Sequence, residues 1–172
     1  LALRTHAFWL LSASMLLAYF TINVVYIHLV PFATDTEVGA SPRTAAFLLS
    51  FLGASSLVGR IACGAVADRT GPRAILAICL GVGGGAMLGL MAVSQLWGLY
   101  GFAIVFGFAS GAMFNLYPGI TGELFGMASL GTIMGATRIG LALGSAASGP
   151  VAGWIFDVSG SYDWAFLVAG LA

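Results

Sequence analysis

The stretch Gly59-Arg-Ile-Ala-Cys-Gly-Ala-Val-Ala-Asp-Arg-Thr-Gly-Pro-Arg73 decides the fold of this 172-residue chain. It holds four of the twelve charged residues, Arg60, Asp68, Arg69 and Arg73, and long apolar runs lie on both sides of it. Arg60 lies inside the upstream apolar run, whereas the other three fall in a short connection that contains glycine and proline. This arrangement predicts two membrane-spanning helices joined by a charged turn at the edge of the bilayer.

The composition of the whole chain agrees with a protein that is embedded in a lipid bilayer. Hydrophobic residues make up 60% and charged residues 7% of the sequence, and the mean hydropathy is +1.03. An ordinary soluble domain is about 25% charged. Six acids balance six arginines, and there is no basic or acidic tail of the kind that binds nucleic acid or a charged protein partner. The predicted fold class is therefore an all-α, multi-pass membrane protein.

Apolar runs separated by short polar turns predict six helices, the last of them incomplete. We expect helices over about 7–34, 43–67, 74–93, 96–121 and 130–156, and a sixth that begins at Trp164. The chain begins at Leu1 and stops at Ala172 within an apolar segment. We therefore expect residues 1–172 to be a helix bundle of a longer protein.

The distribution of arginine near the helix ends predicts an orientation. Arg4, Arg69 and Arg73 fall on one side, and Arg43 falls on the other side among Asp35, Glu37, Asp157 and Asp163. Short basic loops stay on the cytoplasmic side of a membrane. The turn from Asp68 to Arg73 is therefore predicted to be cytoplasmic, in a protein of the cell membrane.

Two arginines within the apolar runs are the strongest candidates for a binding site. Arg60 lies eight residues before Asp68, and Arg138 lies eight residues after Leu130, so both are expected about 12 Å into the bilayer. A membrane-buried arginine costs at least about 2.5 kcal/mol and normally finds an anion. The sequence has no carboxylate at that depth, so the counter-ion is a missing part of the protein, backbone carbonyls or an anionic ligand. The alternative is that each side chain snorkels to the headgroups.

A guanidinium group binds a carboxylate or phosphate through two parallel hydrogen bonds. Two such groups around one cavity would suit a monocarboxylate, a dicarboxylate or an organophosphate. Neutral donors for the same ligand are predicted at Tyr26, Asn23, Ser56 and Asn115. Each of these four is also explained as an interhelical hydrogen bond, and that explanation is favoured.

Other reactive side chains do not form a recognisable catalytic or metal-binding pattern. Cys63 and Cys79 lie in apolar runs and are predicted to be small packing residues. His28 is either a proton relay or an interface residue, and its place near the end of a helix favours the second. The spacings of a catalytic triad or of metal ligands do not occur in the membrane runs. No enzyme activity, metal or cofactor is predicted.

Many of the 25 glycines recur at four-residue spacing, which permits close approach of membrane helices. The rows are Gly81, Gly85 and Gly89; Gly107 and Gly111; Gly131 and Gly135; Gly140 and Gly144; and Gly149 and Gly153. They predict tight packing of the third and fifth helices, or else they reflect the usual glycine content of membrane helices.

The segment from Gly64 to Arg73 resembles the signature loop of the major facilitator superfamily, Gly-x-x-x-Asp-Arg-x-Gly-Arg-Arg, with Pro72 in place of one arginine. The resemblance implies a six-helix half of a twelve-helix transporter and assigns this loop to a cytoplasmic gate. Asp68 is expected to face the positive end of the fifth helix, and Arg69 and Arg73 to pair with Glu123. The gating residues are therefore expected to be Gly64, Asp68, Arg69, Gly71, Arg73 and Glu123.

Three further segments, 26–35, 122–126 and 149–162, look like the C-terminal half of the monocarboxylate transporter and oxalate/formate antiporter branch. In that resemblance Arg60 matches the substrate-binding arginine of the eighth helix, and Arg138 is similar in placement to a basic residue of the eleventh. Monocarboxylate transporters often have an aspartate one turn before this arginine, where this chain has Ser56. The difference leaves proton symport and anion exchange both open.

The sequence thus predicts the C-terminal half of a secondary transporter that moves a small organic anion, a monocarboxylate or dicarboxylate, by alternating access. Its expected partners are the anion, a coupling proton, the lipid bilayer and the N-terminal six-helix half of the same protein. The alternatives are a transporter-like receptor that binds without translocating, and an efflux pump for another small molecule. The two intramembrane arginines argue against efflux of cations.

Overall fold

The apolar runs form long helices in the computed structural model, which describes residues 2–35, 40–93, 95–159 and 163–171. Within these residues the elements are all helical, as predicted. Glu37 and residues 160–162, which entered the predictions above, lie outside the described residues. The elements are η1 (Ala2–Arg4), α1 (His6–Asp35), α2 (Pro42–Thr70), α3 (Pro72–Leu90), α4 (Leu96–Phe125), η2 (Met127–Ser129), α5 (Leu130–Ser159) and α6 (Asp163–Leu171).

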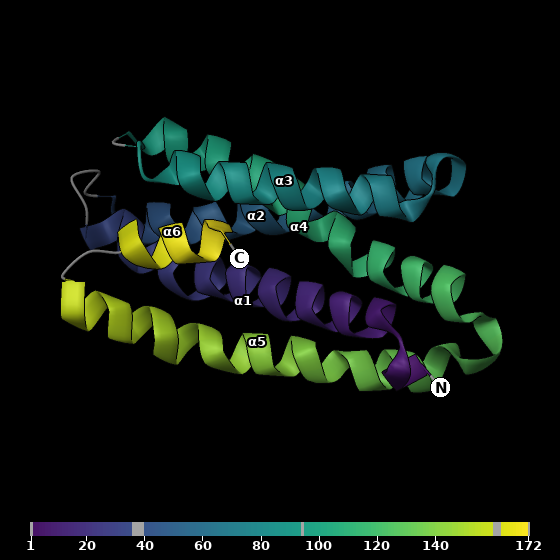
Figure 1. Cartoon of the computed structure of the whole chain (residues 1–172). Coiled ribbons are helices and arrows are strands. Elements are labelled where there is room, and N and C mark those ends of the chain that lie inside the picture. The colour runs from purple at the N-terminus through teal and green to yellow at the C-terminus, as the bar shows by residue number, and fades with distance from the viewer. Residues whose placement is uncertain (1, 36–39, 94, 160–162, 172) are drawn as a thin grey trace.

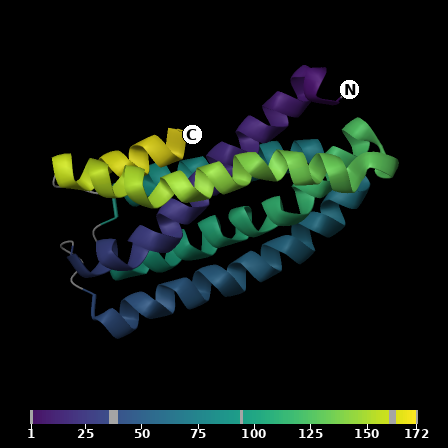
Figure 2. The same ribbon diagram turned by 90° about the horizontal axis from the view of Figure 1, so that it is seen from below.

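Five of the helices, α1 to α5, are long and apolar enough to cross a membrane. They pack side by side, and the two closest pairs join helices that are not consecutive in the sequence (Figures 1 and 2). The main pairs are α2 with α4, α1 with α5, and α3 with α4, while α6 packs chiefly on α3. The N-terminus lies at the same end of the bundle as the connection from α4 to α5 (Figure 1).

The connection between α2 and α3 is shorter than the sequence indicated. The helix continues through Asp68 and Arg69 to Thr70, and the turn consists of one residue, Gly71. Gly71 has a φ of 89°, which a residue with a side chain rarely adopts, and its N–H donates to the carbonyl of Ala67 at 2.8 Å. Pro72 then starts α3, where its missing N–H removes no helical bond. The predicted turn from Asp68 to Arg73 is therefore mostly helix.

The helix α4 also extends beyond its predicted end. The helix was expected to stop at Thr121, but it continues to Phe125 and ends at Gly126, which has a φ of 80°. Glu123 therefore lies on the last turn of a helix rather than in a link. In both places the polar residues at the membrane edge predicted a turn, but they lie on the last turns of a helix, which ends at the first glycine with positive φ.

Two of the predicted glycine rows form close helix crossings. A Cβ atom on Gly107 or Gly111 of α4 would overlap the backbone of Leu52 or Ser56 on α2. A Cβ atom on Gly140 or Gly144 of α5 would likewise overlap the backbone of Ser12 or Leu16 on α1. Each pair of glycines thus lets two helix backbones touch over one turn.

The other predicted glycine rows do not form close helix crossings. Gly81, Gly85 and Gly89 on α3 have no atom within 4 Å of the position of an added Cβ. On that helix it is Gly84 that makes the close contact, with the carbonyl of Gly170 on α6 at 2.8 Å from the Cβ position. The predicted tight packing is therefore found on α5, but on α3 it uses a glycine outside the expected row.

Candidate functional site

Arg60 lies on α2 with its guanidinium group against an aromatic ring of α4. Its Cζ is 4.2 Å from the ring centroid of Phe114, which is a cation–π contact. Its Nε is buried and has no hydrogen-bond partner among the described residues. The backbone carbonyl of Arg60 accepts a bond from the side-chain amide of Asn115 at 3.3 Å. The charge is thus held by a ring face and lacks a protein anion in the described part of the chain.

Arg138 lies on α5 and its side chain is exposed. The helix α5 packs along α1, which carries Tyr19, while Arg60 meets Phe114, a neighbour of Tyr19. The predicted equal depth of Arg60 and Arg138 needs a correction, because α2 extends to Thr70. Measured along the helices, Arg60 lies about 15 Å and Arg138 about 12 Å from the nearer helix end.

Of the neutral donors predicted from the sequence, Asn23 and Ser56 lie in contacts between helices, whereas Tyr26 is exposed. Asn23 donates to Ser145 Oγ at 2.9 Å and to the carbonyl of Tyr19 at 2.8 Å, so it links α1 to α5. Ser56 is buried where α2 crosses α4. Tyr26 is 41% exposed and Asn115 is also exposed, so these two are open to a ligand.

Two aromatic residues of this site, Tyr19 and Phe114, were not predicted from the sequence. Tyr19 packs edge-on against Phe114, with ring centroids 5.5 Å apart and an interplanar angle of 88°. Phe114 in turn carries Arg60 on its ring. The sequence has twelve phenylalanines and five tyrosines in apolar helices, and it offered no signal that distinguishes these two.

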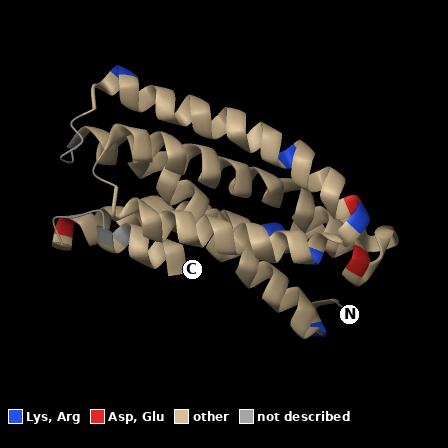
Figure 3. Cartoon of the chain, turned by 90° about the horizontal axis from the view of Figure 1, so that it is seen from above, with Lys and Arg blue, Asp and Glu red and all other residues tan. Residues whose placement is uncertain are grey.

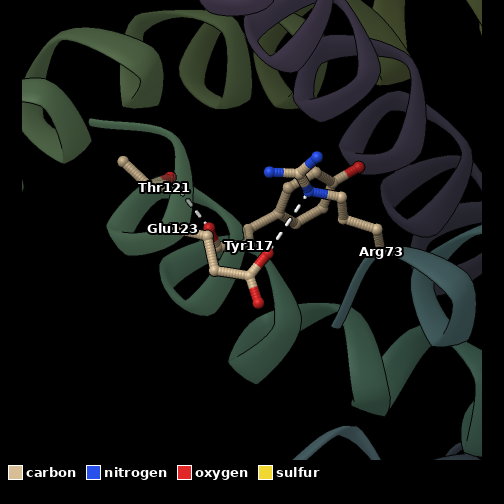
Figure 4. A network of polar contacts seen from close by, with 4 residues as sticks. All are labelled: Arg73, Tyr117, Thr121 and Glu123. Atoms are coloured by element: carbon tan, nitrogen blue, oxygen red, sulfur yellow. Dashed lines mark hydrogen bonds and ion pairs between the residues drawn. The ribbon is translucent and has the colours of Figure 1, made fainter. Parts of the chain in front are cut away.

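An ion pair joins α3 to α4 at the end of the bundle that carries the N-terminus. Arg73 Nε is 3.2 Å from Glu123 Oε2 (Figure 4), and the two side chains are 62% and 43% exposed. Beneath it, Thr121 donates to the carbonyl of Tyr117 at 2.8 Å, and the Tyr117 hydroxyl lies 2.8 Å from Ser14 Oγ on α1. An exposed pair of this kind contributes at most about 1 kcal/mol to stability.

Asp68 lines a cavity of about 500 Å³ together with Asn115 and Glu123 of α4, and with Gly64 and Gly71. The lining of this cavity comes from α2, α3, α4 and the turn between α2 and α3. The expected approach of Asp68 to the beginning of α5 stays a prediction. Arg69 is exposed at the same end of α2. Figure 3 shows acidic and basic residues gathered at this end of the bundle.

The two cysteines are buried neighbours on α2 and α3. Their sulfur atoms are 4.0 Å apart, and both thiols are free. Their burial agrees with the predicted packing role. His28 is also buried, near the end of α1. The described residues contain no group of three or more possible metal ligands.

A cavity of about 480 Å³ lies between α1, α3, α4 and α6, apart from the two arginines. Apolar side chains such as Leu17, Leu80 and Phe106 line it together with glycines, and none of its lining residues is ionisable.

Comparison with known proteins gives a consistent result over nearly the whole chain. Residues 9–172 match the model of the Major Facilitator Superfamily. Monocarboxylate transporter 12 from Rattus norvegicus is 34% identical over 169 residues, which cover 96% of this chain and 34% of that protein. Monocarboxylate transporter 13 from Bos taurus is 34% identical over 149 residues, which cover 86% of this chain and 34% of that protein. The chain spans about a third of the length of these curated relatives.

Proposed function

The chain belongs to the major facilitator superfamily of membrane transporters, and from this premise we propose that it forms the C-terminal half of a transporter for a small organic anion. A multi-pass membrane position follows from the family and from the five spanning helices. The observation that carries the choice of an anion is Arg60, whose buried Nε has no partner among the described residues. Arg60 is partly buried, and an arginine within a membrane span normally faces the protein interior or a wet cavity and pairs with an anion.

A carboxylate is the favoured ligand class because its two oxygens match the two parallel donors of a guanidinium. The names of the relatives, monocarboxylate transporters 12 and 13, support the same class. A dicarboxylate would use Arg60 and Arg138 together, and a monocarboxylate would use one of them. Proton symport and anion exchange are both compatible with Ser56 one turn before Arg60.

The direct test is uptake of labelled carboxylates by vesicles that contain the full-length protein. For a dicarboxylate, Arg60→Ala and Arg138→Ala should each reduce uptake at least tenfold, because each removes a charged hydrogen-bond donor of the ligand, worth about 1.5–3 kcal/mol. For a monocarboxylate, one of the two substitutions should have this effect. Arg43→Ala is the matched control, since Arg43 lies at the other end of α2, near Ser41. Uptake that is unchanged in both arginine variants would refute the anion site. Binding without counterflow would indicate a receptor instead.

We further propose that the signature turn is cytoplasmic and that it acts as a gate. The Arg73–Glu123 ion pair ties the start of α3 to the end of α4, and Asp68 lies in the cavity beside it. Contacts that exist in one conformation and not in the other bias which of the two is populated. Asp68→Asn should therefore impair uptake while the amount of protein in the membrane stays constant. Normal uptake kinetics in that variant would remove Asp68 from the gate.

A further inference from the structure

Tyr19 joins the two arginines of the candidate site, although no motif of the sequence points to it. It lies on α1, which packs along α5, the helix that carries Arg138. Its ring edge meets Phe114 of α4, and the face of Phe114 carries the guanidinium of Arg60. Tyr19 therefore reaches the site from a third helix, between the helices of the two charges.

The backbone under Tyr19 is fixed by the neighbouring turn. Asn23 donates to the carbonyl of Tyr19 at 2.8 Å and to Ser145 on α5 at 2.9 Å. The T-shaped contact with Phe114 fixes the ring itself. The hydroxyl group is thus placed by packing on α4 and by a hydrogen-bonded link to α5.

The hydroxyl proton of Tyr19 lacks an acceptor among the described residues, in contrast to Tyr117, whose hydroxyl pairs with Ser14. A tyrosine hydroxyl inside a protein usually finds a hydrogen-bond partner. The charged group on the far face of this aromatic contact is Arg60, and a guanidinium has donors but no acceptor. The Tyr19 hydroxyl is not among the fully buried unpaired atoms, so its acceptor comes from outside the described chain, as water or as a ligand.

We propose that the Tyr19 hydroxyl donates a hydrogen bond to the same anion that Arg60 and Arg138 bind. This inference rests on the proposed anion-transport function and adds a third donor to its site. An anion between the two guanidinium groups supplies both the missing counter-charge and the missing acceptor. Tyr19 is then a ligand-binding residue, and Phe114 and Asn23 are positioning residues that hold it.

The test uses the full-length protein in proteoliposomes and four labelled anions: acetate, pyruvate, oxalate and succinate. The anion whose uptake depends most on Arg60 is used to compare Tyr19→Phe with the parent. This substitution keeps the ring contact with Phe114 and removes only the hydroxyl. The apparent KM should rise about tenfold or more, as for loss of a hydrogen bond to a charged group, while the maximal rate changes less than twofold.

The controls separate this inference from the proposed function. Tyr100→Phe removes a hydroxyl from the same bundle, near Trp97 and Phe51 and away from the arginines, and should leave the KM unchanged. If uptake depends on Arg60 but Tyr19→Phe keeps the parental KM, the assignment of Tyr19 is wrong and the anion site stands. If none of the four anions gives uptake that depends on Arg60, the proposed function fails, and this inference fails with it.

Discussion

Replacement of Gly111 by alanine is the sharpest test of the bundle, because the α2–α4 crossing leaves no space for a methyl group. The new Cβ would overlap the carbonyl of Ser56, and a backbone atom cannot rotate away as a side chain does. Overpacking in a tight core costs about 1–3 kcal/mol. Alanine also improves helix propensity by up to about 1 kcal/mol, which hides part of that cost.

A second variant, Gly85→Ala, removes this ambiguity. Gly85 lies within α3 and has no atom within 4 Å of its added Cβ, so it gains the same propensity without a clash. The difference between the two variants isolates the packing cost of about 1–3 kcal/mol. For a domain of 150–250 residues this corresponds to about 2–12 °C in melting temperature.

The measurement is the thermal unfolding of purified full-length protein in detergent, followed by tryptophan fluorescence at one scan rate for all variants. Gly111→Ala should melt below the parent, and Gly85→Ala at or above it. Equal melting temperatures for the two variants would refute the described contact between α2 and α4. Gly144→Ala should behave like Gly111→Ala, because its Cβ meets the carbonyl of Leu16 in the α1–α5 crossing.

Three further predictions concern the turn and its surroundings. A double-mutant cycle of Arg73→Gln and Glu123→Gln should give a coupling free energy of unfolding below about 1 kcal/mol, because both side chains are exposed. A larger coupling free energy would mean that the ion pair is shielded from solvent. Copper-catalysed oxidation in membranes should form a disulfide between Cys63 and Cys79, whose sulfur atoms are 4.0 Å apart. Alkylation followed by mass spectrometry measures the loss of both thiols. In the Cys63→Ser control the thiol of Cys79 should stay free. Gly71→Ala should destabilise the protein by about 1–3 kcal/mol, because residues with a side chain rarely adopt its φ of 89° and ψ of 141°. An unaltered melting temperature would contradict that turn geometry.

The helices were predictable because each must cover about 30 Å of hydrocarbon, and runs of that length are visible in the sequence. Their ends were less predictable. Asp68, Arg69 and Glu123 indicated turns by composition, yet a helix that leaves the bilayer carries charged residues on its last turns at little cost. The true ends are set by backbone conformation at Gly71 and Gly126.

The candidate site was predictable only in part, for a similar reason. Arg60 stands out because a charge in an apolar run is costly. Its contact with Phe114 depends on how α4 is rotated against α2, which the close approach at Gly107 and Gly111 fixes. The spacing of residues along the sequence does not specify that rotation. The ion pair of Arg73 with Glu123 was expected from the signature loop, and the structure contains it.

The glycine crossings imply two patterns of tolerance to mutation. In the α1–α5 crossing the close-contact glycines, Gly140 and Gly144, lie on α5, and the facing contact is made by the carbonyls of Ser12 and Leu16, which every amino acid possesses. In the α2–α4 crossing both helices carry such glycines, because a Cβ atom on Gly59 of α2 would overlap the backbone carbonyl of Phe108 on α4. In a saturation mutagenesis experiment Gly140 and Gly144 should therefore be invariant while Ser12 and Leu16 vary, whereas glycine should be required on both sides of the α2–α4 crossing.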